Sequence, residues 1–225
     1  MVSGIGDIAW VPEEGLGSEG EASLAAYDDP RIARVLVPHS RIAERVAELG
    51  ERIAEDSTGV DELRVLVVLR GGFVFAADLG RAISRAGGPA LRFDFVTAKT
   101  YGDELKGVGE VDRIVRVERL PNDLEGADVL IVDDLVDQAF TLSRLVEILE
   151  EQGARSVRSC VLMRKRLEDP SPEVATLRQR LSIEYVGFEI PDFWVAGYGI
   201  DAAGRFRELP EIVAVDEDRC REEPS

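Results

Sequence analysis

The segment from Val129 to Leu149 constrains the fold of this chain more than any other. Four consecutive aliphatic residues, Val129–Val132, have the length and composition of a fully buried strand. Apolar residues then recur at helical spacing from Leu142 to Leu149, and the pattern ends at Gly153. A buried strand followed directly by an amphipathic helix is the repeating unit of a parallel α/β sheet.

The same alternation continues along the chain. The patterns predict further strands at 65–69, 91–97, 114–117, 159–163 and 185–188, and further helices from 40 to before 57 and at 75–85. The polar span Tyr101–Asp112 contains three glycines and no periodicity, which predicts a long loop. We therefore predict an α/β fold in which a parallel sheet is flanked by helices.

The formal net charge of the chain is −17 at pH 7. The average electric field of such a protein repels phosphate groups, which argues against a nucleic acid or an anionic membrane as a partner. A phosphorylated small molecule would have to be held by local backbone amides, by arginines or by a metal ion.

Cysteine usage and hydropathy indicate the compartment. Cys160 lies in an apolar run and Cys220 in a charged segment, which fits neither a disulfide framework nor a metal-ligand spacing. No apolar run has the length of a membrane span, and the first residues lack a signal-peptide pattern. We expect a soluble, cytoplasmic protein.

Three aspartates, Asp133, Asp134 and Asp137, follow the strand at 129–132. The pattern DDLVD also matches the acidic motif of prenyl-diphosphate enzymes, but that motif lies on a helix, whereas a strand precedes it here. A solvated acidic loop is the other alternative, although Leu135 and Val136 interleave the acids. In open parallel sheets, ligands bind outside the carboxyl ends of the strands. Carboxylates there can hold ribose hydroxyls or Mg²⁺, and the amides at the start of the next helix can hold a phosphate.

The stretch VLIVDDLVDQAFT resembles the phosphoribosyl-pyrophosphate motif of type I phosphoribosyltransferases. Four other segments are similar to the hypoxanthine-guanine branch of that family, namely VLRGGFVFAADL, AKTYGD, YVGFEIPDFWVAGYGID and GRFRELPEI. The resemblance covers roughly residues 37–213 and implies a small hood subdomain beside the sheet. The expected organisation is an N-terminal extension at 1–34, a phosphoribosyltransferase domain at 35–215 and an acidic tail at 216–225. The hood would come from the N-terminal part of the domain and from about 185–210.

The resemblance implies a role for each matching residue. Asp133 and Asp134 would hold the ribose hydroxyls and a magnesium ion, and Asp137 would be the general acid/base facing the purine. The 5'-phosphate would be cradled by residues of the turn after the strand, namely Gln138, Ala139, Phe140 and Thr141. Pyrophosphate would be contacted by Arg70, Gly71, Gly72 and Arg207, and covered by Thr100 and Tyr101 when the mobile loop closes. Trp194 and Val195 would bind the purine, and Asp201 would hold a second magnesium ion.

The chain departs from the family pattern at two places. The family has Thr-Gly where this chain has Gln138 and Ala139, and an alanine in a left-handed conformation would cost roughly 1–2 kcal/mol. The family also has a lysine after the fourth strand that contacts the purine carbonyl. Aligned from the strand, Arg164 takes this position, and a shift of one residue gives it to Lys165. Arginine and lysine are not equivalent at such a site.

The resemblance implies a Mg²⁺-dependent purine phosphoribosyltransferase that acts on hypoxanthine or guanine in purine salvage and releases pyrophosphate. Its partners would be phosphoribosyl pyrophosphate and the base, and the family implies a homodimer or homotetramer. Two alternatives stay open at this point. One is a phosphoribosyltransferase for a non-standard base, and the other is a non-catalytic nucleotide-binding regulator with the same fold.

Overall fold

The structure is a computed structural model that describes residues 8–16, 29–101 and 114–221. Within these ranges the main sheet has the strand order β1-β8-β7-β6-β3-β4-β5. Its strands are β1 (Ala9–Trp10), β3 (Glu62–Leu69), β4 (Ala90–Tyr101), β5 (Ile114–Glu118), β6 (Asp128–Val136), β7 (Ser156–Lys165) and β8 (Tyr185–Ile190). Neighbouring strands run parallel except β4 and β5, which pair antiparallel. The predicted α/β fold with a mainly parallel sheet is confirmed.

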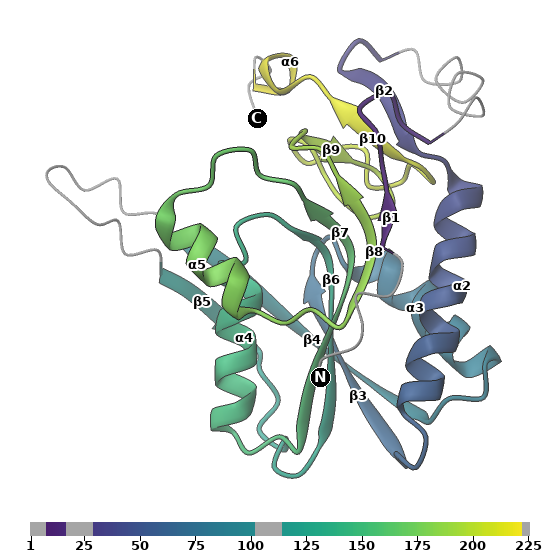
Figure 1. The fold of residues 1–225 in the computed structure, drawn as a ribbon, viewed down its shortest axis with the longest axis vertical. Coiled ribbons are helices and arrows are strands. Elements are labelled where there is room, and N and C mark those ends of the chain that lie inside the picture. Colours follow the sequence, from purple (N-terminus) through teal and green to yellow (C-terminus); the bar gives the residue numbers. More distant parts are fainter. Residues whose placement is uncertain (1–7, 17–28, 102–113, 222–225) are drawn as a thin grey trace, which may run out of the picture.

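Helices cover both faces of the sheet (Figure 1). Helices α2 (His39–Asp56) and α3 (Phe73–Arg85) pack on one face, and α4 (Phe140–Glu151) and α5 (Pro172–Arg180) lie on the other. Strand residues alternate between the two faces: Leu130 and Val132 join the cluster under α2 and α3, whereas Val129 and Ile131 join the cluster under α4. A strand buried on both sides needs apolar residues at every position, which explains the continuous aliphatic runs.

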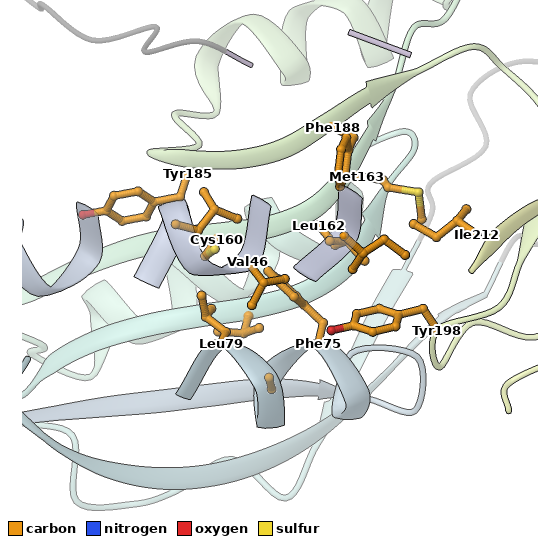
Figure 2. Packing of buried hydrophobic residues seen from close by; sticks show 14 of the residues in the cluster. Val46, Phe75, Leu79, Cys160, Leu162, Met163, Tyr185, Phe188, Tyr198 and Ile212 are labelled. Atoms are coloured by element: carbon orange, nitrogen blue, oxygen red, sulfur yellow. The ribbon is translucent and has the colours of Figure 1, made fainter. Parts of the chain in front are cut away.

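A second, three-stranded antiparallel sheet forms the hood, with the order β2-β10-β9. Its strands are β2 (Ile32–Val37), β9 (Val195–Ala196) and β10 (Ile212–Val215), and the short helix α6 (Glu217–Arg221) follows. Figure 2 shows Tyr198 and Ile212 of this region in the same cluster as Phe75 of α3 and Met163 of β7. The hood therefore shares a core with the main sheet and is held at its carboxyl edge.

The hood differs in extent from the sequence-based expectation. Residues 185–190, which were assigned to the start of the hood, form β8 of the main sheet, and β10 lies beyond the expected end at 210. Cys220 of the expected acidic tail is buried in the hydrophobic cluster of the hood. Within the described ranges, no helix is both long and apolar enough to cross a membrane.

Candidate active site

The central strand β6 extends further than its aliphatic run predicts. It continues to Val136, because Asp133, Leu135 and Val136 keep their pairing with β7. Asp133 and Asp134 thus lie in the last part of the strand and not in the turn after it, where the sequence placed them. Asp137 is the first residue beyond the strand. The three carboxylates therefore lie along the carboxyl end of β6, two within the strand and one just beyond it.

The carboxyl groups of Asp133 and Asp134 are neighbours in a largely desolvated place. Asp133 is only 6% exposed. Burial raises the pKa of both groups, and the negative charge of Asp134 raises that of Asp133 further. Each carboxylate accepts one backbone N–H at 3.0 Å, from Asp134 and Leu135 respectively. Two neighbouring carboxylates that each accept only one backbone hydrogen bond are suited to binding a cation.

The turn between β3 and α3 approaches these carboxylates without a side chain in between. A Cβ added at Gly71 would lie 1.6 Å from Oδ2 of Asp134, so any other residue there would have to displace this carboxylate. From the hood, Gly199 (φ +101°) approaches so closely that its Cβ would lie 2.4 Å from the carbonyl oxygen of Gly71. The peptide bond between Leu69 and Arg70 is cis, and Arg70 is exposed at this turn. Three segments that are distant in sequence therefore meet here: the backbone at Gly199 contacts the backbone at Gly71, which in turn contacts the carboxylate of Asp134.

Arg207 supplies the nearest positive charge from the hood. Its guanidinium donates to the carbonyl oxygen of Gly199 at 2.6 Å and pairs with Asp201. The charge of Arg207 partly offsets the burial that raises the pKa of Asp134. The Asp201 carboxylate also accepts the backbone N–H of Gly204 at 2.9 Å. In this structure Asp201 therefore positions Arg207.

A cavity of about 250 Å³ lies between the end of β6 and the start of α4. It is lined by Asp133, Leu135, Val136, Asp137, Gln138, Ala139, Phe140, Thr141 and Leu142. No side chain caps the first turn of α4, and no acidic residue lies in that turn. The start of α4, where the helix dipole is positive, therefore favours an anion. All four residues expected to cradle the 5'-phosphate line this cavity.

Ala139 resolves the first departure from the family pattern. Its φ of 72° and ψ of 2° lie in the left-handed region, so this position does need the conformation that glycine adopts without cost. The alanine side chain is buried, and the cavity keeps its volume beside it. The chain therefore forms this turn with alanine, at the cost of backbone strain of about 1–2 kcal/mol.

A larger cavity of about 900 Å³ adjoins the first one. Asp137, Gln138 and Phe140 line both cavities, so these residues lie at the junction. Lys165 and Trp194 line the larger cavity, whereas Val195 is buried in β9, beside it in sequence. Trp194 is 42% exposed, as expected for an aromatic surface open to a planar ligand.

The structure separates the two basic residues after β7. The ammonium of Lys165 lies on the cavity wall, 3.0 Å from Asp192 Oδ1 and 3.9 Å from Asp137 Oδ2. Arg164 does not line the cavity and pairs with Glu189 at 2.6 Å. Of the two, only Lys165 is placed to contact a ligand there.

Sequence reasoning missed Arg178 of α5. Its guanidinium donates to the carbonyl oxygens of Asp137 and Lys165, and so ties the turn after β6 to the end of β7. Burial lowers the pKa of Arg178. A single arginine in a weakly amphipathic helix gives no sequence signal for this function. Asp192, the partner of Lys165, likewise has no role among the sequence-based assignments.

The structure describes Thr100 and Tyr101 only in part. Both belong to the backbone of β4, where they pair with Val115 and Ile114 of β5. Their side chains, and the loop at 102–113, lie outside what the structure describes.

The fold and this constellation match one known family. A family model described as a phosphoribosyl transferase domain matches residues 35–203. The chain belongs to this family. It is 37% identical over 187 residues to the hypoxanthine phosphoribosyltransferase of Escherichia coli K12, a match that covers 81% of this chain and 97% of that protein. It is 38% identical over 192 residues to the hypoxanthine-guanine phosphoribosyltransferase of Mycobacterium tuberculosis H37Rv, which covers 82% and 87%.

Solved structures agree with the sequence relatives. A hypoxanthine-guanine phosphoribosyltransferase from Bacillus anthracis superposes with a TM-score of 0.64 at 33% identity, and the match covers 82% of this chain and 99% of that one. A hypoxanthine phosphoribosyltransferase from Trypanosoma cruzi gives a TM-score of 0.69 at 32% identity, with 86% and 96% covered. The predicted resemblance to type I phosphoribosyltransferases of the hypoxanthine-guanine branch is confirmed, and the chain is an enzyme of the pentosyltransferase class.

Gly71→Ala tests the convergence at Asp134. The added Cβ must displace the carboxylate of Asp134, and a displacement of about 1 Å can reduce activity on the order of 10²-fold. We expect such a loss in kcat/KM for phosphoribosyl pyrophosphate. Gly87→Ala is the control, because a Cβ there meets nothing within 4 Å and the residue lies beyond the opposite end of α3. Its φ of +78° makes alanine cost about 1–2 kcal/mol of stability, so the two variants are compared by the kcat/KM of the folded protein. Equal activities of the two variants would contradict the role of this approach.

Asp133→Asn should raise the melting temperature of the unliganded protein at pH 8. The raised pKa of Asp133 means that its ionised form destabilises the fold, and this destabilisation disappears as the pH falls to the ordinary carboxyl range.

Asp128→Asn, on the same strand, should instead lower the melting temperature. Hydrogen bonding to Arg155 lowers the pKa of Asp128, which therefore stabilises the fold at all pH values above its unfolded-state pKa. Thermal denaturation measures both effects, and a lower melting temperature for Asp133→Asn would contradict the prediction.

Proposed function

We propose that the protein transfers the 5-phosphoribosyl group from phosphoribosyl pyrophosphate to hypoxanthine or guanine and releases pyrophosphate, in purine salvage. The main support is the position of Asp137, which lines both the cavity at the start of α4 and the larger cavity with Lys165 and Trp194. A sugar phosphate in the first cavity and a base in the second would meet at this carboxylate. The names of the E. coli and M. tuberculosis relatives support the choice of base.

The reaction forms a bond between a nitrogen of the base and C1 of the ribose. The bond from C1 to pyrophosphate breaks, and the proton on the attacking nitrogen passes to Asp137. The ammonium of Lys165 lies 3.9 Å from Oδ2 of Asp137, on the wall of the larger cavity. As C1 loses its leaving group, the sugar gains positive charge, which nearby carboxylates stabilise in a water-poor site.

Asp133 and Asp134 fit a magnesium ion bound together with the substrate. Mg²⁺ uses one or two carboxylates and fills its remaining positions with phosphate oxygens and water. In the described ranges, no group of three or more metal-ligating side chains is assembled, so the protein alone offers no closed cage there. When bound, the ion would offset part of the negative charge that the diphosphate and the two carboxylates bring together. A second ion at Asp201 would require Asp201 to release Arg207.

The remaining contacts follow the geometry. The backbone from Gln138 to Thr141 would hold the 5'-phosphate. The turn at Arg70, Gly71 and Gly72, together with Arg207, would hold the pyrophosphate, and Thr100 and Tyr101 would cover it. Lys165 would donate to the carbonyl group of the purine, Trp194 would stack on its ring, and the backbone of Val195 would bind its edge.

The alternatives receive less support. Arg164, which motivated a non-standard base, pairs with Glu189 away from the cavity, while Lys165 stands where the family lysine is expected. A non-catalytic regulator has no need of a carboxylate at the junction of two cavities with an ammonium beside it. Turnover measured with a panel of purines would decide among these functions.

The proposal includes a cytoplasmic homodimer. Phe73, Phe93 and Phe95 of α3 and β4 are 46%, 37% and 49% exposed and line one groove of about 790 Å³. Arg81 and Arg85 flank this apolar face, and a second copy of so acidic a chain offers them carboxylates. Because Phe73 directly follows Gly72, contact between two copies would steady the pyrophosphate turn. Oligomeric state has also been studied for the T. cruzi relative.

Asp137→Asn should lower kcat by about 10²–10⁴-fold, the usual contribution of a general acid/base, with little change in KM for phosphoribosyl pyrophosphate. Steady-state kinetics with hypoxanthine and guanine measure both. Unchanged turnover would remove Asp137 from this role.

Phe95→Glu should convert the dimer into a monomer, because it places a charge in the centre of the apolar contact. Sedimentation velocity measures this directly. Phe95→Leu, which keeps an apolar side chain, should remain dimeric. A wild-type protein that sediments as a monomer would contradict the proposed dimer.

A further inference from the structure

The described part of the N-terminal extension, residues 8–16, lies outside the family match, which begins at residue 35. It is nevertheless built into the fold. Strand β1 adds to the edge of the main sheet beside β8, and the backbone N–H of Val11 donates to Glu189 at 2.9 Å. Val11 is fully buried in the cluster under α2 and α3. This segment is therefore packed into the sheet and core although the family model does not extend to it.

The segment is fastened to the wall of the larger cavity on the side of β7. Arg166, which follows Lys165, places its guanidinium 3.2 Å from the centre of the Trp10 ring. The same guanidinium donates to the carbonyl oxygen of Val11 at 3.1 Å. The end of β7 that carries Lys165 is thus joined to β1.

The segment is also fastened to the hood. The guanidinium of Arg34 donates to the carbonyl oxygen of Glu13 at 3.0 Å and lies 5.5 Å from the centre of the Phe193 ring. The N–H of Leu16 donates to the carbonyl oxygen of Leu36 at 2.9 Å. Glu13 is therefore held next to Phe193 and lines the same cavity as Phe193 and Trp194.

The cavity is strongly acidic where Glu13 joins it. Its described lining includes one ammonium, that of Lys165, and the carboxylates of Glu13, Asp137, Glu168, Asp169, Glu173, Asp192 and Glu217. Lys165 is already paired with Asp192. The field in this cavity therefore favours ligand groups that donate hydrogen bonds and opposes an anion.

We propose that Glu13 determines which base the larger cavity accepts. Its carboxylate favours purines with an exocyclic amino group, such as guanine, over xanthine. Guanine carries an amino group at the position where xanthine carries a carbonyl group, and xanthine loses a proton near neutral pH to become an anion. The carboxylate of Glu13 attracts the amino group of guanine and repels the xanthine anion. The inference rests on the proposed function, since it concerns the choice of base in that reaction.

The test compares kcat/KM for guanine and xanthine in the wild type, Glu13→Gln and Glu13→Lys. The ratio of guanine to xanthine should fall by about fivefold in Glu13→Gln, as for the loss of one partly screened charge, and further in Glu13→Lys. Both side chains replace an exposed residue, so the fold should be retained. Glu14→Gln is the matched control, because Glu14 is exposed and adjacent but does not line the cavity.

The outcomes are distinct. A ratio that falls in the Glu13 variants and not in Glu14→Gln supports the inference. If the wild type turns over guanine but the ratio is the same in all variants, or falls equally in Glu14→Gln, the inference is wrong and the proposed function stands. A wild-type protein without activity on any purine would overturn both.

Discussion

Two adjacent carboxylates in the buried end of a central strand are the feature on which the rest of this site depends. Asp133 and Asp134 lie where β6 is still paired with β7, so burial raises the pKa of both, and the charge of Asp134 raises that of Asp133 further. Such an arrangement is unfavourable for the unliganded fold, and natural proteins retain strain of this kind at functional sites. A cation bound there would relieve this destabilisation, and in the proposed function it would let so acidic a protein hold a diphosphate.

Backbone segments from the main domain and the hood approach this pair of carboxylates closely. Gly71 allows the β3–α3 turn to touch the carboxylate of Asp134, and Gly199 allows the hood to touch the turn. Arg207 then brings a positive charge from the hood toward the same place. Because the hood shares its core with the main sheet, these contacts are set by packing and not by the ligand alone. Packing therefore holds the turn, the hood and the carboxylates together before a ligand binds.

The repeating strand–helix pattern predicted the sheet and its flanking helices, because residues buried on both faces leave a continuous aliphatic run. The run at 129–132 could not reveal that β6 extends through two aspartates, since pairing with β7 overrides their low strand propensity. Two-residue strands such as β1 and β9 carry no periodicity at all. The choice between Arg164 and Lys165 depended on strand register, which the structure supplies: Arg164 turns to Glu189 and Lys165 to the cavity. Arg178 acts only through backbone carbonyls, so no motif could have marked it.

The central claim is that the acidic pair admits a diphosphorylated sugar only together with a divalent cation. Calorimetric titration of the protein with phosphoribosyl pyrophosphate, with Mg²⁺ present or replaced by a chelator, tests this claim most directly. The account predicts measurable binding with Mg²⁺ and at least about tenfold weaker binding without it, as expected when two buried anions face an unneutralised ligand. Equal affinity under the two conditions would contradict it.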